Sequence, residues 1–193
     1  MKILVIDNYD SFTYNLVQYI ERIEGTEVTV VRNDKISLDD VEPFDKILIS
    51  PGPGVPDEAG ITKPLIARYG ESKSILGVCL GHQSIAEVYG GSIINLRNVY
   101  HGVSSEMKQT VNDDYLFRGV PGEFDAGRYH SWIVAEPDLP ECLEVTVRNN
   151  EGQIMAMRHR EFDVRGVQFH PESVLTEYGG MMIKNWIEGN HSK

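Results

Sequence analysis

Hydrophobic residues in the first half of the chain alternate between short continuous runs and segments with helical spacing. Continuous apolar runs are typical of strands covered on both faces, whereas apolar residues three and four positions apart are typical of amphipathic helices. Four strands are predicted, at residues 3–6, 28–31, 46–50 and 75–78. Helices are predicted between them, at 12–23 behind a cap at Asp10 or Ser11, as a short turn at 37–41, at 65–69 after Pro64, and at 80–88.

The pattern changes after Gly91, where short β-rich segments follow one another with few helices between them. Strands are predicted at residues 92–99, 102–111, 126–134, 143–148, 153–159 and 164–170, and a final amphipathic helix at 181–187. The first half predicts a parallel sheet with helices on both faces, and the second half adds hairpins. The predicted fold class is therefore α/β. We expect one domain, 1–193, with a three-layer flavodoxin-like or Rossmann-like architecture whose central sheet is mainly parallel with additional antiparallel strands.

Charge and cysteine content restrict the possible partners and surroundings. The 193 residues include 18 basic and 29 acidic side chains, and the net charge of −11 argues against nucleic acids and anionic membranes as partners. Two cysteines, Cys79 and Cys142, form no disulfide framework. The first residues become charged too early for a signal peptide, and no apolar run approaches the length of a membrane span. We therefore expect a cytoplasmic protein.

Cys79 lies at the predicted junction of the strand 75–78 and the helix 80–88. Gly77 and Gly81 stand two positions to either side of it, which is the spacing of a nucleophile elbow. A thiol at the start of a helix also meets the positive end of the helix dipole, which favours the thiolate. The alternative is an inert buried thiol.

A base for this cysteine is predicted at the end of the strand 164–170, because ligands of open parallel sheets bind beyond the carboxyl ends of the strands. His170 can take or give a proton, and Glu172 can hold its imidazole in one tautomer. Cys79, His170 and Glu172 are therefore a candidate triad. Five other histidines lack such a neighbour and are predicted to have surface or core roles: His82, His101, His130, His159 and His191.

The loop Pro51-Gly52-Pro53-Gly54 follows the third predicted strand and faces the same edge. Its prolines have no N–H, so Gly52 and Gly54 are its donors, and Gly54 N–H together with Leu80 N–H is the predicted oxyanion hole. Gln83 lies one helical turn beyond Cys79, where its amide could bind a polar substrate group. A stiff turn without chemistry and a solvated glutamine are the alternatives. Neither a Walker loop nor a dinucleotide-binding fingerprint is present.

Three motifs together resemble the triad (class I) glutamine amidotransferases. They are Cys79-Leu80-Gly81-His82-Gln83, Pro51-Gly52-Pro53-Gly54 and Gly166-Val167-Gln168-Phe169-His170-Pro171-Glu172. The opening residues 7–15 and the closing residues 172–179 resemble one branch of that family, the amidotransferase subunits of anthranilate synthase and aminodeoxychorismate synthase. The resemblance spans nearly the whole chain and implies the class I glutamine amidotransferase fold.

The resemblance also implies roles for individual residues. It makes Cys79, His170 and Glu172 the triad, and it lines the glutamine pocket with Gly52, Pro53, Gly54, Gln83, Ser131 and Trp132. Trp132 departs from the leucine that is usual in the family, and Val103 stands where a lysine is frequent. A backbone contact at position 132 would leave glutamine binding intact, whereas a side-chain contact would alter the pocket.

By the same resemblance, the chain hydrolyses glutamine and supplies ammonia to a separate chorismate-using synthase subunit. Mg²⁺ is expected in that subunit, and no metal or cofactor is expected in this chain. Anthranilate formation in tryptophan biosynthesis is the main expectation; the equivalent subunit of aminodeoxychorismate synthase, or one shared by both, is the alternative. A stand-alone γ-glutamyl hydrolase and a non-catalytic binding module on the same scaffold stay open.

Overall fold

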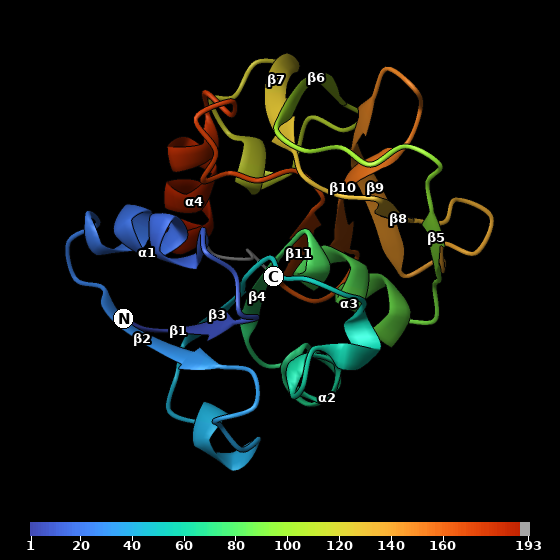
Figure 1. Ribbon diagram of the computed structural model, residues 1–193. Coiled ribbons are helices and arrows are strands. Elements are labelled where there is room, and N and C mark those ends of the chain that lie inside the picture. Colours follow the sequence, from blue (N-terminus) through green and yellow to red (C-terminus); the bar gives the residue numbers. More distant parts are fainter. Residues whose placement is uncertain (190–193) are drawn as a thin grey trace.

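A nine-stranded sheet forms the centre of the protein, whose computed structural model describes residues 1–189 (Figure 1). Its spatial order is β2-β1-β3-β4-β11-β10-β9-β6-β7. The strands of this sheet are β1 (Lys2–Asp7), β2 (Glu27–Arg32), β3 (Lys46–Ile49), β4 (Ser74–Val78), β6 (Val103–Gln109), β7 (Glu123–Arg128), β9 (Leu143–Asn149), β10 (Ile154–His159) and β11 (Val164–Val167). A separate antiparallel pair joins β5 (Ile93–Asn95) to β8 (Trp132–Val134).

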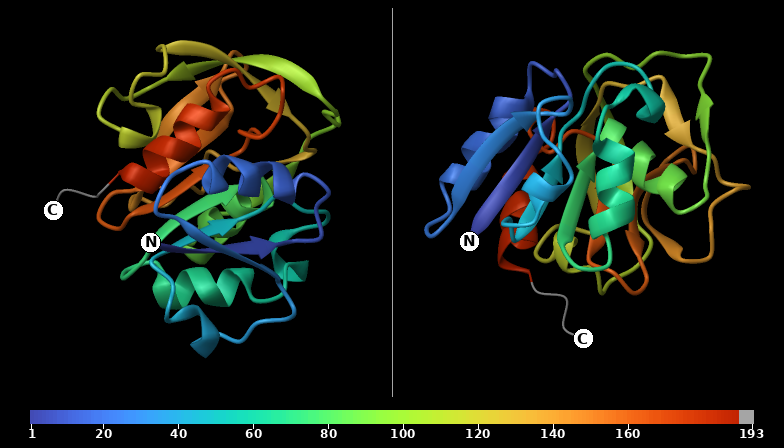
Figure 2. Two further views of the ribbon diagram at one scale, coloured as in Figure 1. Left: turned by 90° about the vertical axis from the view of Figure 1, so that its left-hand side faces the viewer. Right: turned by 90° about the horizontal axis from the view of Figure 1, so that it is seen from below.

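Two pairs of helices cover the two faces of this sheet (Figures 1 and 2). The helices are α1 (Thr13–Glu21), α2 (Thr62–Tyr69), α3 (Leu80–Val88) and α4 (Gly179–Glu188), with short 3-10 turns at Asp39–Val41, Pro56–Glu58 and Tyr115–Phe117. Alternate residues of β1 show the layering: Ile3 and Val5 belong to the core under α1 and α4, whereas Leu4 and Ile6 belong to the core under α2 and α3.

Strands β2, β1, β3, β4 and β11 pair in parallel, and β10, β9, β6 and β7 continue the sheet with antiparallel pairs. The predicted three-layer α/β class, with additional antiparallel strands, is confirmed. Strand β11 comes last in the chain but pairs with β4, with Val167 opposite Val78. This pairing carries the segment after β11 to the same sheet edge as Cys79.

Several predicted boundaries are wrong. The segment 126–134 forms two strands, because the chain leaves the large sheet after Arg128, and His130 and Ser131 instead accept backbone bonds from Tyr100 and Leu96. Helix α2 begins before Pro64, which is tolerated in a first turn whose N–H groups lack intrahelical acceptors. Helix α1 begins at Thr13 without a side-chain cap. Strand β11 ends at Val167, three residues before His170.

Candidate active site

The turn between β4 and α3 has the geometry of a nucleophile elbow. Cys79 has φ +52° and ψ −98°, a conformation that side-chain-bearing residues rarely adopt and that costs on the order of 1–3 kcal/mol. Both flanking glycines are required by close packing. A Cβ on Gly77 would lie 2.5 Å from the backbone of Gly81, and a Cβ on Gly81 would lie 2.9 Å from the Ile49 carbonyl oxygen. The turn places the buried first residue of α3, Leu80, directly after Cys79.

His170 lies between the Cys79 thiol and the Glu172 carboxylate. Its Nδ1 is 2.6 Å from Glu172 Oε1, and both side chains are buried. Burial alone would lower the pKa of His170, but hydrogen bonding to Cys79 and Glu172, and their charges, raise it to about 10. The contact with Cys79 is looser than the one with Glu172, because no group within 1–189 meets His170 Nε2 at full hydrogen-bonding geometry; such contacts are often long before substrate binds. The structure therefore brings together the three residues of the predicted triad.

Backbone contacts fix the segment that carries His170. The His170 N–H donates to the Gly127 carbonyl at 3.0 Å, and the His170 carbonyl accepts from Thr176 Oγ1 at 2.7 Å. Thr176 Oγ1 in turn accepts the Gly127 N–H at 3.0 Å. The Tyr129 ring packs against the imidazole with ring centroids 4.8 Å apart. Gly127 in β7 and Thr176 therefore fix the backbone of His170, and Tyr129 packs against its ring.

Gln83 and Trp132 form a second part of the site. Gln83 is buried, and its Nε2 donates to the Trp132 carbonyl at 2.9 Å and to Gln168 Oε1 at 3.2 Å. Its amide hydrogens are thus used within the protein, and the predicted direct contact with substrate stays a prediction. Trp132 contributes its backbone carbonyl, which also lies 3.0 Å from His130 Nδ1. A tryptophan in place of leucine preserves this backbone role.

The loop after β3 is anchored to the loop after β1. Asn8 donates its backbone N–H to Ser50 Oγ at 2.9 Å and its side-chain amide to the Ser50 carbonyl at 2.9 Å. A Cβ on Gly52 would lie 2.5 Å from Asn8 and 3.1 Å from Leu80 Cδ2, so Gly52 packs directly beside the first residue of α3. The Leu80 N–H has no acceptor within its helix.

Pro53 and Gly54 are exposed at the tip of this loop. Gly54 has φ +79°, and a Cβ there would lie 2.4 Å from Glu58 Oε2. The three atoms nearest to that Cβ position all belong to Glu58, and the place of Gly54 in an oxyanion hole with Leu80 stays a prediction. Ser131, also predicted in the pocket, uses its carbonyl to accept the Leu96 N–H at 2.6 Å.

Sequence reasoning missed two polar residues beside the triad. Gln168 is fully buried and donates from Nε2 to Cys79 Sγ at 3.4 Å. Burial raises the pKa of Asp10, on which the charges of His170 and Glu172 also act, so this carboxyl lies near the triad. Both belong to motifs quoted above, but their side-chain directions depend on the sheet pairing.

Four of the five other histidines have the surface or core positions that were predicted for them. His82, His130 and His159 are buried, and His101 is exposed; His191 lies outside the described residues. Burial, with a smaller contribution from the Arg128 charge, lowers the pKa of His130 to about 3. Within 1–189, no group of three or more His, Cys, Asp or Glu side chains could hold a metal ion, and no helix has the length and apolar character to cross a membrane.

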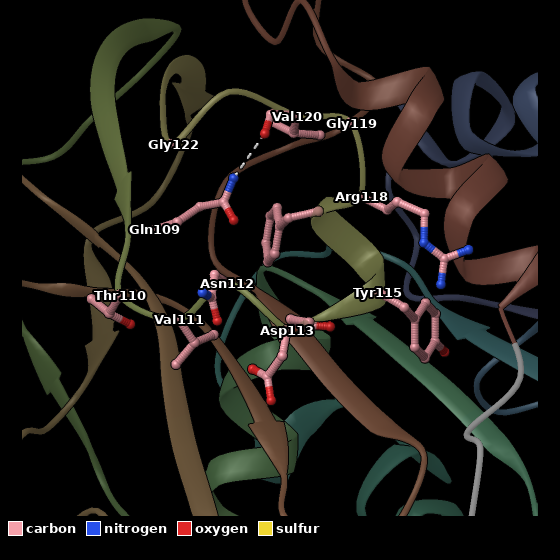
Figure 3. Close-up of a pocket in the computed structure, with 12 residues that line it drawn as sticks. Gln109, Thr110, Val111, Asn112, Asp113, Tyr115, Arg118, Gly119, Val120 and Gly122 are labelled. Carbon is pink, nitrogen blue, oxygen red and sulfur yellow. Dashed lines mark hydrogen bonds between the residues drawn. The ribbon is translucent and has the colours of Figure 1, made fainter.

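A small cavity adjoins this site, and a larger pocket lies away from it. A cavity of about 90 Å³ lies against His170 and Glu172 and is also lined by Phe12 and Tyr129. A larger surface pocket of about 900 Å³ is lined by residues between Gln109 and Gly122 (Figure 3). Gln109, one of its lining residues, donates to the Val120 carbonyl at 3.1 Å. None of the predicted site residues lines the larger pocket.

Comparisons with known proteins agree with the fold and the motifs. The family model "Glutamine amidotransferase class-I" matches residues 4–189. The chain is 48% identical to the aminodeoxychorismate/anthranilate synthase component 2 of Bacillus subtilis, covering 96% of this chain and 95% of that protein. It is 47% identical to the anthranilate synthase component 2 of Thermus thermophilus, covering 97% and 92%.

A solved structure with lower sequence identity has a similar fold. A protein from Thermoplasma acidophilum, described as a putative subunit of GMP synthase, superimposes with a TM-score of 0.85 at 25% identity, covering 97% of this chain and 92% of that one. The fold, the matched residues and the relatives are consistent with one another. This chain belongs to the class I glutamine amidotransferase family and is an enzyme subunit of that family.

Proposed function

We propose that this chain is the glutaminase subunit of anthranilate synthase, which hydrolyses L-glutamine and supplies ammonia to a chorismate-using synthase subunit. The observation that carries the catalytic part is the buried His170 imidazole between a thiol and a carboxylate, with its pKa raised to about 10. The identity of the product rests on the relatives named above. Mg²⁺ belongs to the synthase subunit in this proposal.

The first half-reaction forms a thioester. The Cys79 thiolate attacks the side-chain carbonyl carbon of glutamine, and the carbonyl electrons move to oxygen, where the Leu80 and Gly54 N–H groups hold the charge. When the tetrahedral intermediate collapses, the C–N bond breaks and His170 gives its proton to the departing ammonia. Glu172 holds the imidazole in the tautomer that this transfer needs.

The second half-reaction releases glutamate. His170 takes a proton from water, the resulting hydroxide attacks the thioester carbonyl, and the C–S bond breaks to return the Cys79 thiolate. Ammonia released into neutral water would be protonated and lose its nucleophilicity. The proposal therefore requires a synthase subunit docked closely enough to receive ammonia before it reaches bulk solvent.

The equivalent subunit of aminodeoxychorismate synthase is the second candidate, favoured by the combined name of the Bacillus subtilis relative. Mixing the purified chain with each candidate synthase, chorismate and glutamine separates the two. Fluorescent anthranilate with one synthase supports the main proposal, product formation with only the other supports the alternative, and activity with both indicates a shared subunit.

Replacing the nucleophile tests the catalytic part. In the assembled complex, Cys79→Ser should abolish glutamine-dependent synthesis and leave ammonia-dependent synthesis unchanged, because the synthase site is intact. Cys142→Ser is the matched control, since Cys142 is the second free thiol of the chain. It should retain both activities. Loss of both activities in a correctly folded Cys79→Ser complex would refute the division of labour.

A further inference from the structure

The parallel pairing of β4 with β11 places Gln168 beside the nucleophile. Val167 lies opposite Val78, and the Cys79 N–H donates to the Val167 carbonyl at 2.8 Å, so the next residues along the two strands are Cys79 and Gln168. The Gln168 side chain is fully buried, and its Nε2 lies 3.4 Å from Cys79 Sγ. A buried amide donor therefore contacts the sulfur on the side of β11.

The direction of this amide follows from its neighbours. The Trp132 carbonyl can only accept, so the amide of Gln83 must turn its Nε2 toward it. The same Nε2 also faces Gln168, which must present Oε1 to receive the bond. The donor end of Gln168 is then left for the sulfur. A flipped Gln168 amide would place its NH₂ group against the NH₂ group of Gln83. Two donors facing each other are unfavourable in a buried site.

We propose that Gln168 is a catalytic residue of the glutaminase reaction, donating Nε2–H to the Cys79 sulfur and holding negative charge there. The inference rests on the proposed function and deepens it. Donation to an anionic sulfur favours the charged form, which burial opposes. The bond is available to the thiolate before attack, weakens as sulfur becomes a neutral thioester, and forms again when water displaces the thiolate.

The hydrogen bonds that lead from Trp132 through Gln83 to Gln168 have a consequence for the glutamine pocket. Trp132 and Gln83 were predicted to line that pocket, and they are the residues that orient Gln168. Movement of the Trp132 backbone on glutamine binding would therefore reach the sulfur through Gln83 and Gln168. The bulk of the Trp132 side chain has no part in this connection, because only its carbonyl is used.

Two variants remove the donor in different ways, and both are made in a Cys142→Ser background so that alkylation reports on one thiol. Gln168→Met keeps a similar volume without a donor, and Gln168→Glu replaces the donor by an anion. Gln109→Met is the matched control, because Gln109 also donates its amide to two backbone carbonyls but lines the pocket of Figure 3. Thermal denaturation establishes that each variant is folded.

The first measurement is the rate of iodoacetamide alkylation as a function of pH. We expect the profile of Gln168→Met to move to higher pH by about one unit, and that of Gln168→Glu to move further. The kcat for glutamine hydrolysis with the synthase present should fall about 10- to 100-fold, with a smaller change in KM. Gln109→Met should match the parent in both measurements.

A folded Gln168→Met variant with the parent's alkylation profile would overturn the inference. A parent protein that alkylates normally but hydrolyses no glutamine with any synthase would instead refute the proposed function. If neither variant folds, the side-chain ¹⁵N–H signals of Gln168 decide in the unaltered chain. They should shift with pH together with alkylation and lose that shift in Cys79→Ser; a pH-independent signal would overturn the inference.

Discussion

Two buried histidines lie against the same strand, β11, in opposite electrostatic surroundings. His82 packs against Gly166 within the strand, where its Nδ1 would lie 2.7 Å from an added Cβ, and His170 lies just beyond the end of the strand. Burial lowers the pKa of His82 to about 4, and contact with the Gly166 backbone offsets only part of this. Burial also opposes charge on His170, yet its pKa is raised to about 10 by Cys79 and Glu172.

The difference shows that charged partners, and not burial, decide which histidine can act as a proton carrier. Both rings are removed from water, and desolvation disfavours the cation at both positions. Only His170 has a carboxylate 2.6 Å from Nδ1 and a thiol on its other side. His82 is held neutral and fills the space between α3 and β11.

Removing the carboxylate should make the two histidines alike and has the largest expected effect. Glu172→Gln keeps the shape of the side chain but removes the charge that holds the imidazolium and its tautomer. We expect kcat for glutamine hydrolysis to fall by about three to four orders of magnitude, as in triads whose carboxylate becomes an amide. Steady-state assays of the complex with glutamine and with ammonia measure this.

The control for that experiment is Glu177→Gln, which removes an exposed carboxylate five positions along the same loop. It should retain the parental kcat. Ammonia-dependent synthesis should be unchanged in both variants. A Glu172→Gln complex within tenfold of the parent on glutamine would show that His170 does not depend on this partner.

A substitution at Gly166 tests whether His82 packs tightly against β11. A Cβ in Gly166→Ala would lie 2.7 Å from His82 Nδ1, so the ring or the strand must shift, and overpacking of this kind costs about 1–3 kcal/mol of unfolding free energy. Gly122→Ala is the control, because nothing lies within 4 Å of its Cβ position. Urea denaturation should show a coupling between Gly166→Ala and His82→Ala; strict additivity would mean that the two residues do not clash.

The parts of this site that were predicted from the sequence follow from local spacing or from the rule that parallel strands end at one edge of a sheet. Gly77 and Gly81 indicate the elbow around Cys79 within five residues. His170 and Glu172 are separated only by Pro171. The meeting of Cys79 with His170 was predicted because both follow parallel strands, and the carboxyl ends of parallel strands share an edge.

The other contacts of the site depend on which strands pair in the sheet, and no local sequence pattern determines that pairing. The Gln168 contact with sulfur exists because β11 pairs with β4, although a long stretch of chain separates them. Likewise, the hydrogen bonds that Gln83 donates to the Trp132 carbonyl and to Gln168 join segments far apart in the sequence, and the predicted contact of Gln83 with substrate stays a prediction. The predicted strand 126–134 was wrong because Tyr129 to Ser131 leave one sheet to enter another.

The smallest expected effect is the pH dependence of stability that His82 causes. Because its pKa is lower in the folded chain than in the unfolded one, its contribution is fully present above about pH 6.5 and is lost as pH falls toward 4. From pH 7 to pH 5, the parent should therefore lose about 1–2 kcal/mol more unfolding free energy than His82→Leu.

His170 should show the opposite sign in the same denaturation series. Its raised pKa makes its contribution fully present below about pH 6.5 and lost as pH rises toward 10, so the deficit of His170→Gln should shrink at alkaline pH. If His82→Leu and His170→Gln diverged from the parent in the same direction as pH falls, the contrast between the two buried imidazoles would be wrong.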